Sequence, residues 1–337
     1  MKQKVLIFAT SFLDELLTHP EGEGRAMEML KNLEKDHNII VEYRCNRNPS
    51  KPLEEQELDS VIAVIVDLEK YRRELLSKVG VKAGGELRLI SRYGIGVDSV
   101  DLNAATEYGV LVTNTPGANA LPTAEWAVTT MLDVAGRRIH QHEVASRGRT
   151  KRGPSRVDIS GKTLGVVGTG NIGKNVVKLL KGFEMKVIAS DLYPDERWAE
   201  ENNVSYTDLE SLCREADFIT LHASAGKTII GEAEIALMKP MVVLVNCARG
   251  ILVDNRSVYK AVKDGKIWGY GIDEVWEYAD LPTNGLNIVT SPHVGSDTDR
   301  GKVNMQIASA RAVIDFIEGR RPQHPVNPEV LDLRGAP

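Results

Sequence analysis

Three glycines spaced as G-x-G-x-x-G constrain the fold of this chain more than any other feature. Gly168, Gly170 and Gly173 lie between an apolar run that predicts a strand over 163–168 and a helical pattern that begins near Asn171. The first glycine permits a tight turn, the second lets a pyrophosphate approach the backbone, and the third lets helix and strand pack closely. The N–H groups at the start of the helix then face the phosphates. The spacing therefore predicts a dinucleotide-binding strand–helix–strand unit.

An acidic residue stands where such a unit needs one. Asp191 closes the next predicted strand, "MKVIASD". A carboxylate there accepts hydrogen bonds from the ribose hydroxyls of adenosine and repels a 2′-phosphate, which favours NAD over NADP. The alternative is a tight turn between strand and helix that binds no ligand.

The rest of the chain alternates short apolar runs with longer amphipathic stretches, as α/β proteins do. The apolar start "VLIFA" is too short for an export signal and is followed by Asp14 and Glu15, so it reads as the first strand. Runs rich in Val, Ile and Leu are typical of a parallel sheet covered on both faces. We predict strands over 4–9, 39–44, 61–66 and 87–92, with a helix over 23–37 between the first two.

The second part of the chain repeats this alternation. A short helix ends at Gly109, the strand "VLVTNTP" follows, and a long helix has Pro122 in its first turn, where a missing N–H does no harm. Six further strands are predicted, which is the number in a full dinucleotide-binding sheet. They are "KTLGVVG", "MKVIASD", "FITLHA", "VVLVNCA", "WGYGID" and "LNIVTSP". An amphipathic helix over 299–320 ends the pattern.

Composition excludes several classes of function. Of the 337 residues, 42 are Lys or Arg and 47 are Asp or Glu, so the net charge of −5 gives no reason to expect nucleic acid or an anionic membrane as partner. No apolar run is long enough to span a bilayer. Cys45, Cys213 and Cys247 are too few and too scattered for a disulfide framework or a zinc site, so we expect a cytoplasmic protein without a metal. The cation-rich stretch 146–158 predicts a surface loop; the alternative is a region that attracts a phosphorylated or polycarboxylic substrate.

Three polar residues follow predicted strands, at the edge where open α/β sheets bind their ligands. Arg249 comes just after "VVLVN" and carries a fork of donors that suits a carboxylate. Asp273 closes "WGYGID", where it would meet the nicotinamide end of the cofactor. His293 follows the last strand in "TSPHVG" and is a candidate for acid–base chemistry.

These motifs together resemble the family of NAD-dependent D-isomer-specific 2-hydroxyacid dehydrogenases, which includes phosphoglycerate and D-lactate dehydrogenases. The resemblance covers nearly the whole chain, with several motifs in the family's order. They are "RYGIGVDSVDLNAATEYGVLVTNTPGANALPTAEWAV", "GKTLGVVGTGNIG", "LMKPMVVLVNCARGILVD", "GKIWGYGID" and "NIVTSPHVG".

The resemblance implies a fold of two Rossmann-like domains, in which a doubly wound parallel sheet for NAD is inserted into a flavodoxin-like substrate domain. Residues 1–102 would form the first part of the substrate domain, 103–293 the NAD-binding domain, and 294–337 the helix that completes the substrate domain. The family also implies a homodimer, with the long helix that starts near Pro122 close to the partner.

The resemblance further implies a reaction and a set of site residues. The protein would interconvert a 2-oxo acid and a D-2-hydroxy acid by hydride transfer with NAD. Backbone N–H groups of "GIG" at 94–96 would bind the substrate carboxylate, together with Arg249, and His293 would exchange a proton with the substrate oxygen. The implied substrate contacts are Ile95, Gly96 and Arg249, and the implied cofactor contacts are Gly168, Gly170, Asn171, Ile172, Gly173, Asp191, Cys247, Ala248 and Asp273.

The chain departs from the family pattern after Asp273. Members of the family pair the histidine with a glutamate that stabilises its protonated form, and the corresponding position here is Tyr278. Glu277 is the replacement that we predict, because a slip of one residue places it there, and Asp280 is the alternative. In a third possibility the whole loop is solvated and His293 works without a carboxylate.

A second departure is "LHASAGKTII", where Ala223 and Ser224 stand in a loop that usually contains a proline and packs near the cofactor. Two other functions also stay open. One is a dehydrogenase of another small anion, as formate and phosphite dehydrogenases are. The other is a binding protein that senses NAD(H) without catalysis, since fold alone does not imply activity.

Overall fold

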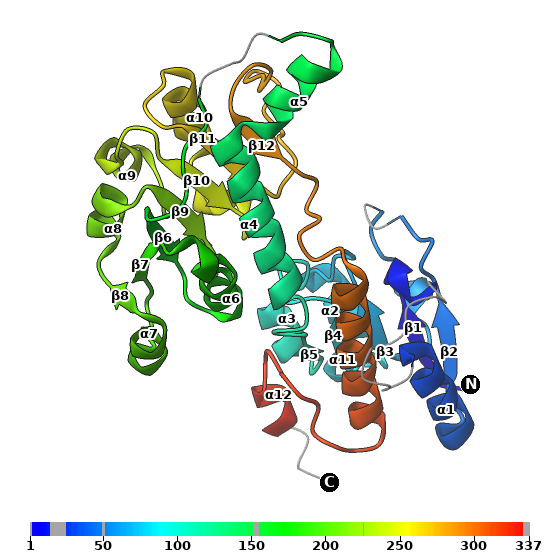
Figure 1. Cartoon of the computed structure of the whole chain (residues 1–337). Coiled ribbons are helices and arrows are strands. Elements are labelled where there is room, and N and C mark those ends of the chain that lie inside the picture. Colours follow the sequence, from blue (N-terminus) through cyan, green and yellow to red (C-terminus); the bar gives the residue numbers. More distant parts are fainter. Residues whose placement is uncertain (1, 14–24, 49–50, 151–154, 225, 333–337) are drawn as a thin grey trace. The chain divides into compact units, whose positions relative to one another are not determined.

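The computed structural model describes residues 2–13, 25–48, 51–150, 155–224 and 226–332. The chain forms two compact units, each with its own sheet (Figure 1). The first unit comprises Met1–Asn119 and Thr298–Pro337, and the second comprises Ala120–Asp297. The boundaries differ from those expected at 102 and 293. Residues 103–119 belong to the first unit, because the strand Leu111–Thr113 pairs with the strand Leu89–Arg92 of that unit.

The sheet of the first unit has five parallel strands in the order β2-β1-β3-β4-β5, which is the flavodoxin-like order. The strands are β1 (Lys4–Ile7), β2 (Ile40–Tyr43), β3 (Val61–Val66), β4 (Leu89–Arg92) and β5 (Leu111–Thr113). The helices of this unit are α1 (Ala26–His37), α2 (Arg73–Val79), α3 (Leu102–Glu107), α11 (Asp299–Ile317) and α12 (Glu329–Asp332).

Both faces of this sheet are covered, which explains the continuous apolar runs in its sequence. All six residues of β3 are buried. Helices α1 and α11 pack on one face, whereas α2 and α3 pack on the other. The C-terminal helix therefore completes the core of the first unit, although a long stretch of sequence separates it from the other elements.

The second unit contains seven parallel strands in the order β12-β11-β10-β9-β6-β7-β8. The strands are β6 (Thr163–Val167), β7 (Lys186–Ser190), β8 (Val204–Tyr206), β9 (Phe218–Leu221), β10 (Val243–Asn246), β11 (Gly269–Ile272) and β12 (Ile288–Thr290). The order is that of a dinucleotide-binding sheet with one strand added at the β12 edge, and the strand order reverses between β6 and β9. The predicted fold class is confirmed. The strand β8 was not predicted, because Val204–Tyr206 contains no continuous apolar run.

Helices cover both faces of this second sheet (Figure 1). They are α4 (Ala120–Gly136), α6 (Asn171–Leu180), α7 (Glu196–Asn202), α8 (Leu209–Glu215), α9 (Glu232–Leu237) and α10 (Asn255–Lys263). The further helix α5 (Arg138–Ser146) follows α4 and has no buried residue. The single long helix expected after Pro122 is divided into α4 and α5. Arg137 separates them in a left-handed backbone conformation with φ of 48°.

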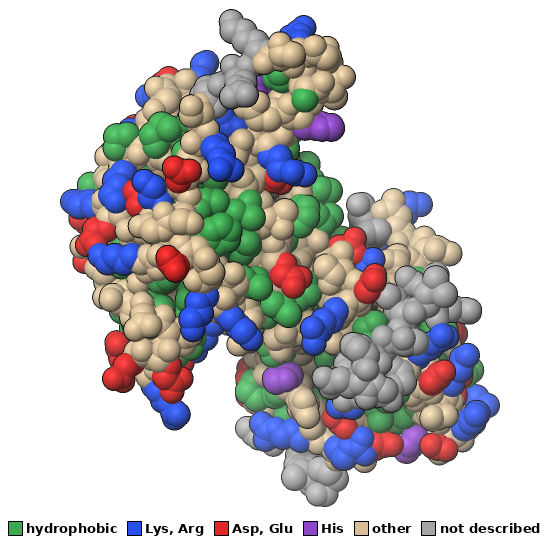
Figure 2. Space-filling model, in the orientation of Figure 1, with side chains coloured by type: hydrophobic (Ala, Val, Ile, Leu, Met, Phe, Trp, Pro, Cys, Tyr) green, Lys and Arg blue, Asp and Glu red, His purple; other side chains and the backbone are tan. Residues whose placement is uncertain are grey.

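The predicted helices at the two ends are shorter in the structure. Residues 23 and 24 of the helix expected over 23–37 lie outside the described residues, and the helix expected over 299–320 ends at Ile317. In the part of the chain that the structure describes, no helix is both long and apolar enough to cross a bilayer. On the face shown in Figure 2, basic and acidic side chains are interspersed rather than gathered into patches of one sign.

Candidate active site

The glycine loop connects β6 to α6, at the point where the strand order of the second sheet reverses. Gly168 has φ of +93°, and a side chain there would meet the backbone of His222 and Ala223 at less than 3 Å. A side chain at Gly173 would collide with the carbonyl oxygen of Gly168, so the helix start packs directly on the turn. Gly170, by contrast, has open space within 4 Å. The space beside Gly170 is therefore open, so a pyrophosphate can approach the backbone there, as a bound dinucleotide requires.

Asp191 follows the end of β7 and is hydrogen-bonded to this loop. Its carboxylate accepts hydrogen bonds from Thr169 N (2.6 Å), Thr169 Oγ1 (3.0 Å) and Tyr193 N (2.9 Å). Burial opposes ionisation of this group, but the hydrogen bonds from Tyr193 and Thr169 outweigh it and hold the pKa of Asp191 below its usual range. The carboxylate is thus charged at neutral pH and is held beside the glycine loop.

Further residues around Asp191 were not predicted. The hydroxyl groups of Tyr206 and Thr169 lie 2.7 Å apart, so Tyr206 supports the threonine that binds Asp191. Leu192 and Tyr193 follow Asp191 and are 88% and 87% exposed. Two exposed apolar side chains beside the loop offer a surface for a flat ring, and their proximity to Asp191 in the sequence was the signal that could have found them.

The loop after β9 lies against the first glycine of the motif. His222 donates its N–H to Val167 O at 2.7 Å, and its ring Nε2 lies 2.9 Å from Thr220 Oγ1. Burial lowers the pKa of His222 to about 3, so the ring is neutral near pH 7. Its Nδ1 atom is buried without a hydrogen-bond partner within the described residues. The loop with Ala223 and Ser224, which differs from the usual one, therefore still packs against Gly168.

Arg249 lies at the end of β10 in a turn that Asn246 fixes. Asn246 is buried; its Nδ2 donates to Arg249 O at 2.8 Å and its Oδ1 accepts from Ala248 N at 3.1 Å. Arg249 Nη1 donates to Ala248 O at 2.8 Å. Cys247 is buried in the same turn, and burial raises the pKa of its thiol to about 12. The thiol is therefore not a nucleophile, and Asn246 is a positioning residue that the motif alone did not reveal.

Asp273 organises the segment that carries the candidate histidine. Its carboxylate accepts hydrogen bonds from Ser291 Oγ (2.6 Å), Val294 N (2.9 Å) and Gly295 N (2.7 Å). His293 lies between these contacts with φ of 57°, a left-handed conformation that non-glycine residues rarely adopt. Asp273 was predicted to meet the cofactor, and the structure adds a role: it fixes the position of the turn from Ser291 to Gly295.

The strand ends bring three predicted residues to one edge of the sheet. Strands β10, β11 and β12 are neighbours and run parallel, so Arg249, Asp273 and His293 follow adjacent strands at the same edge. In open α/β sheets this edge is where ligands bind.

The acidic segment after Asp273 is attached to α10. Trp276 Nε1 donates to Leu281 O at 2.9 Å, and the ring of Trp276 lies against those of Tyr259 and Tyr278. Asp280 forms an exposed ion pair with Arg256, with Oδ2 2.7 Å from Nη1, and the guanidinium lowers the pKa of Asp280. Asp280 is therefore engaged on the surface of α10.

The two remaining carboxylates of this segment differ in their surroundings. Glu277 is exposed, and the described residues provide it with no hydrogen bond or ion pair. Glu274 is partly buried, and its Oε2 atom is buried without a hydrogen-bond partner among the described residues. The carboxylate of Glu274 occupies the space that a side chain at Gly250 would fill, next to Arg249. Glu274 directly follows Asp273 in the sequence and is not among the predicted partners of His293.

The predicted carboxylate-binding loop belongs to the first unit and follows β4. Gly94 N donates to Thr115 Oγ1 (3.1 Å), and Thr115 N donates to Gly94 O (3.0 Å). Asn114 Nδ2 donates to Ile95 O at 2.8 Å. The N–H of Gly94 therefore points into the protein rather than toward a ligand, contrary to the expectation for the whole "GIG" stretch. The N–H groups of Ile95 and Gly96 have no acceptor within the described residues.

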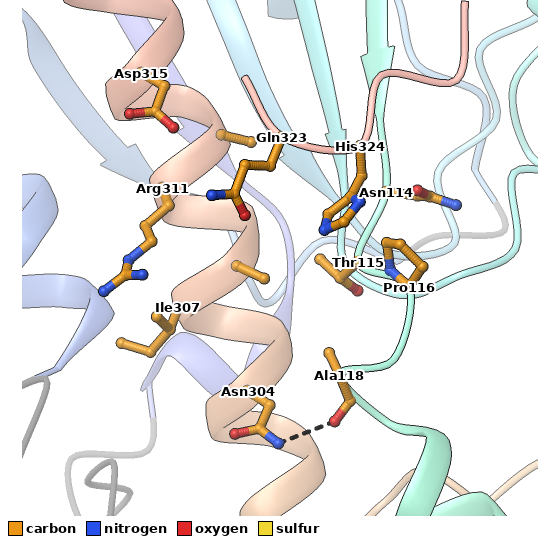
Figure 3. Close-up of a pocket in the computed structure, with 12 residues that line it drawn as sticks. Asn114, Thr115, Pro116, Ala118, Asn304, Ile307, Arg311, Asp315, Gln323 and His324 are labelled. Atoms are coloured by element: carbon orange, nitrogen blue, oxygen red, sulfur yellow. Dashed lines mark hydrogen bonds between the residues drawn. The ribbon is translucent and has the colours of Figure 1, made fainter. Parts of the chain in front are cut away.

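Asn114 and Thr115 also line a cavity of about 240 Å³ beside α11 (Figure 3). Its other rim carries Arg311 and Gln323, and Asn304 donates a hydrogen bond to Ala118 O at its lower end. None of the predicted site residues lines it. Elsewhere, no group of three or more His, Cys, Asp or Glu side chains that could hold a metal ion occurs within the described ranges.

Comparison with known proteins gives these geometries a context. Residues 128–295 match the model of the D-isomer specific 2-hydroxyacid dehydrogenase NAD binding domain. The glyoxylate reductase of Thermococcus litoralis is 35% identical over 320 residues, which cover 90% of this chain and 94% of that protein. The D-3-phosphoglycerate dehydrogenase of Methanocaldococcus jannaschii is 37% identical over 279 residues, but the chain spans only 52% of its length.

A solved structure agrees over the whole chain. The D-lactate dehydrogenase from Aquifex aeolicus, crystallised with NAD and lactic acid, superposes with a TM-score of 0.79. The two proteins are 26% identical, and the match covers 96% of this chain and 99% of that one. The expected use of NAD as cofactor is confirmed by these comparisons.

Proposed function

The chain belongs to the D-isomer specific 2-hydroxyacid dehydrogenase family, and from that premise we propose that it reduces small 2-oxo acids such as glyoxylate with NADH. As a member of this family, the protein is an NAD-dependent oxidoreductase that interconverts 2-oxo and D-2-hydroxy acids. The choice of glyoxylate is supported by the Thermococcus litoralis reductase, which aligns over nearly its whole length. The observation that carries the proposal is the arrangement of Arg249, Asp273 and His293 after three adjacent parallel strands.

The cofactor is held, in this proposal, by residues whose surroundings fit it. Gly168, Gly170 and Gly173 provide the open backbone for the pyrophosphate, and Asp191 accepts hydrogen bonds from the ribose hydroxyls. The further contacts are Asn171 and Ile172 at the helix start, Cys247 and Ala248 after β10, and Asp273. Leu192 and Tyr193 provide an apolar surface for the adenine ring. Bound NADH supplies the hydride that reduces the carbonyl carbon.

The chemistry of the substrate rests on three groups. The N–H groups of Ile95 and Gly96 bind the substrate carboxylate. Arg249 binds the same carboxylate and the carbonyl oxygen, and its permanent positive charge stabilises the negative charge that develops on that oxygen. His293 donates a proton to the oxygen during reduction and accepts it during oxidation. Asp273 holds the turn that presents His293.

The carboxylate that stabilises protonated His293 is Glu277 in this proposal, as the sequence predicts. Glu277 is exposed and has no other partner among the described residues, so its side chain is available. Glu274 is the rival, because its buried Oε2 atom lies beside Gly250 without a hydrogen bond. Asp280 is a weaker candidate since Arg256 already engages it.

We also propose a homodimer in the cytosol. Helix α5 has nine residues and none is buried, and Ile139 is 47% exposed on it. A helix this short is marginal in water unless a neighbour packs against it, and a second copy of the chain can supply that neighbour. The three cysteines are buried free thiols, which suits a reducing compartment.

The test is the rate of NADH oxidation by the purified protein with a panel of 2-oxo acids, from glyoxylate and pyruvate to branched, dicarboxylic and phosphorylated members. We expect turnover with glyoxylate and loss of turnover in an Arg249→Ala variant. Reduction of NAD by formate or phosphite, without turnover of any 2-oxo acid, would favour the rival small-anion dehydrogenase. Binding of NADH without turnover of any substrate would favour a sensor and overturn the proposal.

A further inference from the structure

We propose that Asp67 makes the substrate site selective for 2-oxo acids with a single negative charge, by repelling a second carboxylate or a phosphate at the far end of the substrate. The inference rests on the function proposed above and names the substrate class within it. It concerns the end of β3, which none of the family motifs includes.

Asp67 lies at the same sheet edge as the loop that binds the substrate carboxylate. It directly follows β3, and the loop Gly94–Gly96 follows β4 after Tyr93. Strands β3 and β4 are paired neighbours with Val66 opposite Arg92, and Tyr93 N donates to Val66 O at 2.8 Å. Parallel neighbours end at a common edge, so a ligand bound at the loop meets the residues after β3.

Arg92 connects Asp67 to the loop. Its Nη1 atom lies 3.3 Å from Asp67 Oδ1 and donates to Tyr93 O at 2.8 Å. The same Nη1 atom is 3.8 Å from the position that a side chain at Gly94 would take. The Arg92 side chain is only 11% exposed, whereas the Asp67 side chain is 41% exposed. The negative member of this pair therefore faces outward beside the loop, and the positive member lies behind it.

The two residues that follow Asp67 add an apolar surface but no exposed charge. Leu68 is an apolar side chain that is 58% exposed, whereas Glu69 is buried, and its Oε2 accepts a hydrogen bond from Asp67 N at 3.1 Å. The next cations along the chain, Lys70 and Arg72, line a separate cavity of about 550 Å³ together with Glu55 and Glu74. Asp67 and Leu68 thus present one negative charge and one apolar surface.

The size of the effect follows from Coulomb's law. Two like unit charges about 5 Å apart in a water-like environment repel enough to change a binding constant by about fourfold, and by more where the site excludes water. The relatives of this chain include reductases named for a monoanion and dehydrogenases named for a phosphorylated acid. A carboxylate beside the loop favours the first kind of substrate.

The experiment compares two competitive inhibitors of glyoxylate reduction, malonate with two carboxylates and butyrate with one. In Asp67→Asn, we expect the inhibition constant of malonate to decrease about fourfold while that of butyrate stays unchanged. Asp67→Glu keeps the charge and should keep the wild-type ratio of the two constants. Glu107→Gln is the matched control, because it also removes an exposed carboxylate paired with an arginine, Arg73, in the same unit.

The outcomes separate this inference from the function on which it rests. In one outcome the wild-type enzyme reduces glyoxylate, but the Asp67→Asn variant binds both inhibitors as the wild type does. That outcome would overturn the selectivity role of Asp67 and leave the proposed function standing. An equal change for malonate and butyrate would do the same, because it would show a structural role. Failure of the wild-type protein to reduce any 2-oxo acid would overturn the proposed function and this inference with it. Asp67→Ser provides a second neutral variant if Asp67→Asn does not fold.

Discussion

Arg249 is positioned by a neighbour rather than by its own contacts alone. The buried amide of Asn246 bonds both Ala248 N and Arg249 O, so the turn after β10 has a defined shape. In the same way, three hydrogen bonds to Asp273 fix the turn that carries His293. At the scale of residues, the proposed chemistry depends on such supporting groups, and two predictions test the roles assigned to the side chains.

Replacing Arg249 by alanine should reduce kcat/KM for glyoxylate by roughly 10²-fold to 10³-fold, because a charged donor to the developing oxyanion is removed. Arg256→Ala is the control. Arg256 lies on α10, which follows β10 in the chain, and it pairs with Asp280 at the surface. An exposed ion pair of this kind contributes little to stability. Steady-state kinetics of the two variants provide the measurement. Equal losses in both would contradict the role of Arg249.

The carboxylate partner of His293 can be identified from pH–rate profiles. If Glu277 stabilises the protonated imidazole, Glu277→Gln should shift the alkaline limb of kcat/KM for reduction to lower pH, since the proton donor is lost earlier. Glu274→Gln and Asp280→Asn should keep the wild-type profile. A shift in Glu274→Gln alone would transfer the role to the carboxylate beside Gly250. Unchanged profiles in all three variants would mean that His293 works without a carboxylate.

At the scale of elements, the junction of β6 and β9 combines close packing with a buried titratable group. Gly168 has no room for a side chain because the loop after β9 lies against it. His222 begins that loop and is held neutral by burial, with a pKa of about 3. The sheet at this junction is therefore sensitive to acid.

The sign of this effect follows from proton binding. Between pH 6.5 and 3 the unfolded chain protonates this histidine and the folded chain does not, so the unfolded state binds more protons and acid favours unfolding. The stabilising contribution is complete above pH 6.5 and is lost as the pH falls toward 3. In His222→Gln, the slope of unfolding free energy against pH should decrease in this interval by up to about 1.4 kcal/mol per pH unit.

Urea unfolding followed by circular dichroism at several pH values checks this prediction. His142→Gln removes an exposed imidazole from α5 and should leave the slope as it is in the wild-type protein. A slope that does not change in His222→Gln would show that His222 does not account for the acid sensitivity.

At the scale of the whole molecule, α5 is a helix that the described residues leave uncovered. None of its nine residues is buried, and Arg137 before it has a left-handed conformation that separates it from α4. An uncovered short helix that bears an apolar side chain is a candidate contact with a second copy.

The Ile139→Glu variant should shift the protein from dimer to monomer, because a charge would be placed in a contact that excludes water. Sedimentation velocity at several protein concentrations measures the change in mass. The control Glu143→Gln alters the charge of α5 without adding one to its apolar side. A wild-type protein that sediments as a monomer would contradict the proposed dimer.

The sequence by itself determined the features that local chemistry dictates. The G-x-G-x-x-G spacing needs glycine for steric reasons, and runs of Val, Ile and Leu are typical of strands covered on both faces, so the two sheets and the cofactor could be predicted. Domain boundaries and strand pairings could not be predicted as well from the sequence. The strand β5 was assigned to the wrong domain because hydrogen bonding to β4, rather than any local signal, decides where it belongs.

Only the tertiary structure decided which side chains meet. Four carboxylates lie at or after the end of β11 within a short segment, and their spacing did not separate them, because their surroundings are set by other elements of the fold. Asp273 bonds the turn from Ser291 to Gly295, Asp280 pairs with Arg256, and Glu274 lies beside Gly250. Asp67 likewise pairs with Arg92 on the next strand, and its proposed role in selectivity depends on that contact. Such contacts join residues distant in sequence, so packing and electrostatics in the folded chain determine them.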